Sequence, residues 1–191
     1  MICLFSIQTW AQSGKLFNTD NQLSSNLATQ VFQDKSGFIW IATRNGLNNY
    51  DGYHINVIKK DMSNFLGLNS NYINSIAQDE KEHILLGTNN SLLEFTGSEF
   101  LKIPMLDSKG KELATYVKQV YPLKNKDIAV ATSGYGIMLK KQDEQKCHAM
   151  KGEVEKLKYI HKLLEDKRGR LWIITEDGKL YRKETNGRVT S

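Results

Sequence analysis

The segment from residue 34 to residue 47 reads Asp34-Lys35-Ser36-Gly37-Phe38-Ile39-Trp40-Ile41-Ala42-Thr43-Arg44-Asn45-Gly46-Leu47. An Asp-x-x-Gly turn precedes an apolar, β-branched run, and a second turn follows at Asn45-Gly46. In such turns Asp accepts local backbone hydrogen bonds and Gly adopts a positive φ, whereas Ile, Trp and Thr favour strands. The segment therefore predicts a turn, a short strand and a second turn into another strand.

The same pattern recurs along the chain. Threonines at 43, 88, 132 and 175 follow one another at intervals of 45, 44 and 43 residues, and an Asp lies nine positions before three of them, at 34, 79 and 166. The third copy, at residues 127–134, is weaker, because no Asp lies nine positions before its Thr and no Trp stands in its strand. A period of roughly 40–45 residues with about four short strands per unit is the signature of a β-propeller blade.

Residue polarity within the repeats favours the same architecture. Ile39-Trp40-Ile41-Ala42 and Leu171-Trp172-Ile173-Ile174 are apolar at consecutive positions, so both faces of each strand must be covered. A blade between two neighbouring blades meets that need. We expect Trp40 and Trp172 to pack between blades, and the four repeated threonines to satisfy backbone groups at strand ends.

The predicted fold class is all-β, with about four four-stranded antiparallel blades forming a partial propeller. Residues 13–191 carry the repeats, with blades near 24–60, 68–103, 114–142 and 157–191, and with long polar connections at 59–69, 104–113 and 140–157. One passage gives a conflicting signal, because apolar residues between Val154 and Leu164 have helical spacing. The repeat register instead places a strand at 159–165; we expect the register to prevail, with a helix as the alternative.

The first residues, Met1 to Ala11, form a short apolar run that ends at a small residue. This run resembles the second half of a secretory signal peptide, so we interpret 1–12 as a signal-peptide remnant and expect export; an ordinary N-terminal strand is the alternative. The net charge is +5, but the lysines are interleaved with acidic residues, which argues against a nucleic-acid site. Two cysteines, Cys3 and Cys147, are too few for a disulfide scaffold.

The pattern Asp-x-x-Gly-x-x-Trp-Ile-x-Thr-x-x-Gly-Leu, complete in Asp34 to Leu47, resembles the two-component regulator propeller repeat of Bacteroidetes hybrid sensor histidine kinases. The resemblance covers about residues 15–191. It implies a periplasmic ligand-sensing segment without catalytic activity, and an oligosaccharide as a possible ligand. It also implies that further blades and kinase domains belong to an inner-membrane parent chain that forms a homodimer. The sequence has no kinase His box and no receiver acid cluster, so we expect an N-terminal fragment.

Candidate ligand-binding residues come from comparing the repeats. Thr and the following turn recur, whereas the pair after each Thr varies; these pairs are Arg44-Asn45, Asn89-Asn90 and Glu176-Asp177. Such side chains could contact sugar hydroxyls; the alternative, which the pattern favours, is that they are plain turn residues. No catalytic residue, metal site or cofactor is predicted, because the histidines at 54, 83, 148 and 161 show no ligand spacing. Two alternatives remain open: a streptogramin-lyase-like propeller enzyme, which would need a His–acid cluster lining the channel, and a protein-interaction scaffold.

Overall fold

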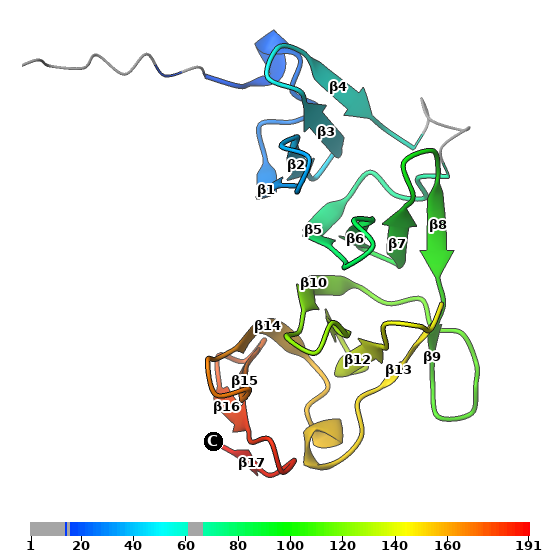
Figure 1. The fold of residues 1–191 in the computed structure, drawn as a ribbon, viewed down its shortest axis with the longest axis vertical. Coiled ribbons are helices and arrows are strands. Elements are labelled where there is room, and N and C mark those ends of the chain that lie inside the picture. Colours follow the sequence, from blue (N-terminus) through cyan, green and yellow to red (C-terminus); the bar gives the residue numbers. More distant parts are fainter. Residues whose placement is uncertain (1–13, 15, 61–66) are drawn as a thin grey trace, which may run out of the picture.

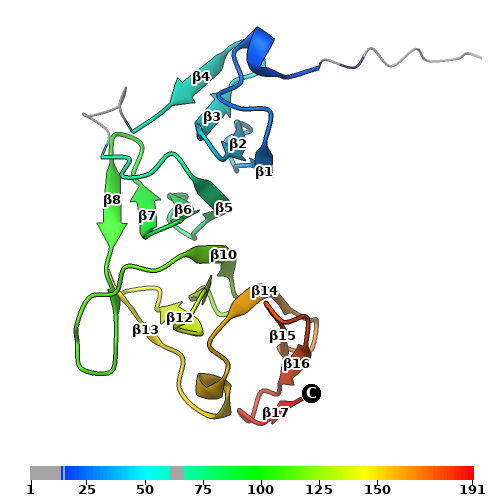
Figure 2. The same ribbon diagram turned by 180° about the vertical axis from the view of Figure 1, so that it is seen from behind.

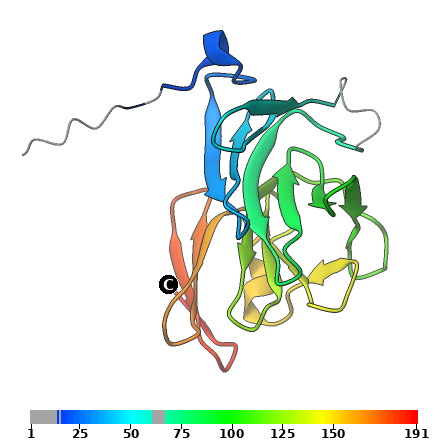
Figure 3. The same cartoon turned by 45° about the horizontal axis from the view of Figure 1, so that its top comes forward.

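The computed structural model describes residue 14 and residues 16–60 and 67–191. The predicted signal-peptide remnant at 1–12 lies outside the described residues. Four antiparallel sheets follow one another around an arc (Figure 1; Figure 2 shows the arc from behind). In three of them the strands run in sequence order from the innermost to the outermost, whereas the third carries at its outer edge the strand that comes first in the sequence. In Figure 3 the N-terminal segment (dark blue) lies at one end of the arc and the last strands (red) at the other.

Three of the sheets have four strands and the third has five. Sheet 1 contains β1 (Ala28–Gln33), β2 (Ile39–Thr43), β3 (Gly46–Tyr50) and β4 (Ile55–Ile58); sheet 2 contains β5 (Ile73–Gln78), β6 (Ile84–Thr88), β7 (Leu92–Phe95) and β8 (Phe100–Ile103). Sheet 3 contains β9 (Met105–Leu106), β10 (Val117–Pro122), β11 (Ile128–Thr132), β12 (Ile137–Lys140) and β13 (Cys147–Ala149); sheet 4 contains β14 (Ile160–Glu165), β15 (Leu171–Thr175), β16 (Leu180–Lys183) and β17 (Val189–Thr190). Two 3-10 helices, η1 (Thr19–Asn21) and η2 (Glu153–Lys156), lie outside the sheets.

This arrangement confirms the all-β class with four antiparallel blades. One sheet differs from the sequence expectation. The third sheet gains a parallel edge strand, β9, and its fourth strand β13 lies inside the segment expected to be a polar connection. The helical spacing between residues 154 and 164 yields only the short η2, and Ile160–Glu165 forms a strand as the register predicted. The fourth sheet has four strands, the last of them β17.

Three apolar clusters hold the sheets together. Within each second strand, alternate side chains point to opposite neighbours: Ile84 and Leu86 of β6 pack toward sheet 1, and Leu85 packs toward sheet 3. Ala129 of β11 and Ile173 of β15 meet in the third cluster, between sheets 3 and 4. Consecutive apolar positions are therefore buried because each inner sheet has a neighbour on both faces.

The repeated threonines act as predicted. The hydroxyls of Thr43, Thr88, Thr132 and Thr175 each donate to a backbone carbonyl in the hairpin that follows, namely those of residues 46, 91, 136 and 179. All four threonines are buried, so each bond satisfies two polar groups removed from water. The threonine spacing thus marks the same strand end in every sheet.

Candidate functional site

Every innermost strand has a bulge near its start, so the bulges lie along the one face of the arc on which these strands begin. The register of the first strand shifts around Thr29, Asn74, Lys118 and His161. A β-bulge inserts one residue and turns its side chain out of the regular alternation. In two sheets this side chain reaches the next sheet: Thr29 Oγ1 donates to the Ile73 carbonyl oxygen (2.6 Å) and Asn74 Nδ2 to that of Val117 (2.9 Å).

Aromatic side chains precede the bulges. Tyr72, Tyr116 and Tyr159 each stand one residue before the first paired residue of their strand, and that first paired residue lies opposite the repeated threonine of the same hairpin. The rings of Tyr72 and Tyr116 meet edge to face, with centroids 6.0 Å apart. Because the three tyrosines occupy equivalent positions in sheets 2, 3 and 4, they lie in a row along the face of the arc on which the innermost strands begin.

Charged groups flank these rings. Arg44, from the turn after β2, lies 5.5 Å from the centre of the Tyr72 ring, and Lys118 Nζ lies 4.5 Å from the centre of the Tyr116 ring. Lys118 also forms an ion pair with Glu176 of the turn after β15, at 3.3 Å. We call the set Arg44, Tyr72, Tyr116, Lys118, Tyr159 and Glu176 the tyrosine rim. It draws one or more residues from each of the four sheets.

The Tyr116 phenol is held as a neutral group. Its hydroxyl donates to Asn74 Oδ1 at 2.8 Å. Burial, followed by the neighbouring Tyr72, raises the pKa of Tyr116 to about 12. At neutral pH the rim therefore presents an uncharged phenol between two cations and one carboxylate.

A cavity of about 470 Å³ opens beside Tyr159. Its walls include Thr175, Glu176, Asp177 and Tyr181, together with Leu157 and the lysines on either side of it, Lys156 and Lys158. Glu176 thus belongs both to the rim and to the cavity, and its backbone N–H donates to the Tyr159 carbonyl oxygen at 2.9 Å. A cavity of this size accommodates a small organic ligand.

The structure separates the six residues singled out from the sequence. Arg44 and Glu176 join the rim, and Asp177 lines the cavity, where it accepts from Thr175 (2.5 Å) and pairs with Lys179 (2.7 Å). The remaining three serve their own turns: Asn45 donates its backbone N–H to Thr43, Asn89 accepts from Ser70, and Asn90 accepts from Thr88.

Sequence reasoning missed the tyrosines. They recur at 72, 116 and 159, which gives the same 44- and 43-residue intervals as the last three threonines. This shared period is the sequence signal that predicts them. Lys118 carried no such signal, because the other bulge positions hold Thr, Asn and His.

Comparison with known proteins follows the same segments. The profile of the family described as two component regulator propeller matches residues 22–45, 67–90 and 156–177. These matches cover the first hairpins of sheets 1, 2 and 4, and omit the third, whose sequence is the weakest copy. These three segments are similar to the two component regulator propeller repeat. None of the curated proteins compared with the chain matches it.

Solved structures share the fold. The extracellular domain of a hybrid two component system from B. thetaiotaomicron has 17% identity and a TM-score of 0.73, over 87% of this chain and 25% of that one. PorZ, a surface component of the type-IX secretion system of Porphyromonas gingivalis, has 18% identity and a TM-score of 0.61, over 82% and 26%. Virginiamycin B lyase from Staphylococcus aureus has 12% identity and a TM-score of 0.65, over 85% and 54%. The chain thus spans about a quarter of the length of the first two.

Proposed function

We propose that these regulator propeller repeats form the ligand-sensing part of a hybrid two-component sensor histidine kinase, exported to the periplasm, and that an oligosaccharide binds at the tyrosine rim. The matching repeats and the extracellular sensor domain of similar fold support the sensor assignment. Among the described residues, no helix has the length and apolar character needed to cross a bilayer. The rim itself is the observation that carries the ligand proposal.

The chemistry of the rim suits a sugar chain. Tyrosine rings offer flat apolar surfaces with a polar tip, and Arg44, Lys118 and Glu176 offer donors and acceptors for hydroxyl groups. Because the tyrosines belong to three successive sheets, a ligand that contacts them all must be extended. The adjoining cavity of about 470 Å³ would take a terminal unit of such a chain.

The rest of the proposed receptor lies beyond these four sheets. Sheet 4 exposes Leu164, Ile174 and Leu180 on the face turned away from sheet 3, and the equivalent faces of sheets 1 to 3 are covered by the next sheet. We propose that a further blade of the parent chain packs there. Kinase domains and a homodimer complete the proposal, and this segment itself binds without catalysing a reaction.

The enzyme alternative lacks a comparable observation. It needs a His–acid pair on the inner strands, which face the channel. His83 and Glu94 lie 2.9 Å apart, but they come from the turn before β6 and from β7, at the end of β5 opposite the rim. The likeness to virginiamycin B lyase, at 12% identity, concerns the fold.

The proposal is tested by measuring binding of a panel of neutral and acidic oligosaccharides to the chain by calorimetry. Tyr72→Ala and Tyr116→Ala are expected to weaken binding of any positive oligosaccharide by 10-fold or more, a loss of about 1.4 kcal/mol each. Tyr53→Ala, at an exposed turn outside the rim, serves as the control and is expected to have no effect. Equal affinity of the rim variants and the wild type would overturn the assignment of the rim.

A further inference from the structure

The turn between β5 and β6 differs from its equivalents in sheets 1 and 4. In those sheets the turn aspartate accepts a hydrogen bond from a Trp indole: Trp40 Nε1 donates to Asp34 Oδ2 (2.8 Å) and Trp172 Nε1 to Asp166 Oδ2 (2.9 Å). In sheet 2 the Trp position holds Leu85, which has no donor. Asp79 keeps its bonds from the turn amides through Oδ1, while Oδ2 loses the partner that its counterparts have.

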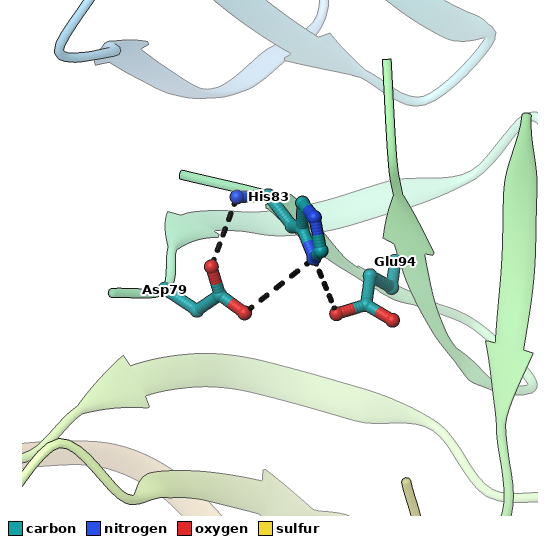
Figure 4. A group of neighbouring side chains, drawn as sticks. All are labelled: Asp79, His83 and Glu94. Atoms are coloured by element: carbon teal, nitrogen blue, oxygen red, sulfur yellow. Dashed lines mark hydrogen bonds and ion pairs between the residues drawn. The ribbon is translucent and has the colours of Figure 1, made fainter. Parts of the chain in front are cut away.

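A histidine and a second carboxylate occupy the space beside Asp79. His83 Nδ1 lies 3.8 Å from Asp79 Oδ2 and 2.9 Å from Glu94 Oε1 (Figure 4). Glu94 stands on β7 directly opposite Leu85, so the strand register brings it to the turn. One ligand atom from each residue lies within 4.8 Å of the other two.

Both carboxylates are removed from water, with residue exposures of 8% for Asp79 and 5% for Glu94. One imidazole N–H can donate to only one of them. Among the described residues, no side-chain nitrogen of Lys or Arg lies within 4 Å of either carboxylate. Two buried carboxylates that share one imidazole are not neutralised by it, and a bound cation would compensate their charge.

We propose that Asp79, His83 and Glu94 form a binding site for a divalent transition-metal ion, with Zn²⁺ as the fitting case. One imidazole nitrogen and two carboxylate oxygens are ligands that Zn²⁺ accepts, whereas Ca²⁺ and Mg²⁺ favour all-oxygen sites. Tetrahedral Zn²⁺ with bonds of about 2.0–2.2 Å places its ligand atoms about 3.4 Å apart. The distances from His83 Nδ1 to the two carboxylates, 2.9 and 3.8 Å, straddle that value, and all three ligand atoms lie within 4.8 Å of one another, so side-chain adjustment on binding would complete the site.

The surroundings allow a fourth ligand and limit its size. A cavity of about 10 Å³ adjoins Asp79 and is closed by residues of sheet 3, including Lys140 and Gln142. That volume is about the space of one water molecule. The ion would join the β5–β6 turn to β7 and stiffen one end of sheet 2. The site lies at the opposite end of β5 from the tyrosine rim, so it stands independently of the proposed sensory function.

The first experiment measures zinc bound to the chain after equilibrium dialysis, with Cys3→Ser as the background to remove a competing thiol. One Zn²⁺ per chain is expected, and His83→Gln and Glu94→Gln are each expected to weaken binding at least 10-fold. His54→Gln is the matched control, because His54 Nδ1 also lies 3.8 Å from a turn aspartate, Asp51, but has no second carboxylate beside it. A wild type that binds no zinc, or an equal loss in His54→Gln, would overturn the proposal.

A second measurement needs no substitution in the site. Mn²⁺ added at substoichiometric amounts is expected to broaden the imidazole NMR signals of His83 before those of His54, His148 and His161. Zn²⁺ at 100-fold excess over its Kd is expected to raise the Tm by about 5 °C, and Mg²⁺ to leave it unchanged. Broadening that begins at His148, which lies 3.8 Å from Glu144, or an equal rise with Mg²⁺, would contradict the assignment.

Discussion

Sheets 1 and 4 each contain a tryptophan at the same position of the repeat. The two tryptophans make the same local hydrogen bond but differ in their tertiary packing. In both, the indole N–H donates to the turn aspartate six residues earlier. Trp40 is 6% exposed and packs edge to face against Phe95 of sheet 2, with ring centroids 5.8 Å apart. Trp172 is only partly buried, and its ring contacts the guanidinium groups of Arg170 and Arg182 at 5.7 and 5.5 Å.

The comparison separates what a repeat determines by itself from what its neighbour determines. The turn, the strand register and the indole hydrogen bond are the same in both sheets, because they involve residues of one repeat. Burial differs, because only Trp40 has a following sheet against which to pack. We predicted that both tryptophans pack between blades: the structure bears this out for Trp40, whereas Trp172 lies outside the cluster that joins sheets 3 and 4. Its face is where the proposed further blade would lie.

The largest expected effect comes from removing the two indoles separately. Trp40→Ala leaves a cavity between sheets 1 and 2 and should lower the free energy of unfolding by about 4 kcal/mol. Trp172→Ala removes a partly solvated ring and should cost about 1 kcal/mol. Urea denaturation followed by circular dichroism measures both values. If the two losses were equal, the neighbouring sheet would not be the source of the difference.

Acid titration tests whether the local bond holds without a neighbouring sheet. The hydrogen bond from Trp172, followed by those from Arg170 and Arg168, holds the pKa of Asp166 well below its usual range. A depressed folded-state pKa adds stability above the unfolded value, about 3.9, which is lost as the pH falls toward the folded-state pKa. Asp166→Asn should therefore lower the Tm at pH 7, and the difference from wild type should shrink below about pH 4.

Asp177 provides the control for that titration. Hydrogen bonds from Lys179 and Thr175 lower its pKa to about 2, without any tryptophan. Trp172→Phe should raise the pKa of Asp166, measured by carboxyl NMR shifts, and leave that of Asp177 unchanged. An unchanged Asp166 would mean that the indole bond contributes little to holding the carboxylate ionised.

The sequence was sufficient for the blades because their pattern is local and repeated. The turn aspartates, the alternating apolar strands and the threonines at strand ends all follow from residues within one repeat. The tyrosine rim could not be predicted from residues within one repeat. Arg44 contacts Tyr72 only when sheet 1 packs against sheet 2, and Lys118 pairs with Glu176 only when sheet 3 packs against sheet 4. The histidines showed no ligand spacing for the same reason, since Glu94 reaches His83 from another strand.

The smallest expected effect concerns the turn before each second strand. Gly37 (φ 93°) and Gly169 (φ 75°) occupy the left-handed position in sheets 1 and 4, where sheet 2 has Glu82 (φ 66°). A non-glycine residue in this conformation costs about 1–2 kcal/mol, and glycine costs about 0.5–1 kcal/mol through the unfolded chain. Glu82→Gly should therefore raise the free energy of unfolding by about 0.5 kcal/mol.

The reverse substitution isolates the conformational cost in sheet 4. A Cβ at Gly169 would lie 3.6 Å from the Thr185 methyl, which is ordinary contact, so Gly169→Ala introduces backbone strain without a clash. We expect a loss of about 1 kcal/mol in urea denaturation. The contradicting outcome is that Glu82→Gly destabilises the chain while Gly169→Ala has no effect. In that case the repeats would not share a requirement for a left-handed residue at this turn position, and sheets 1, 2 and 4 would not be equivalent there.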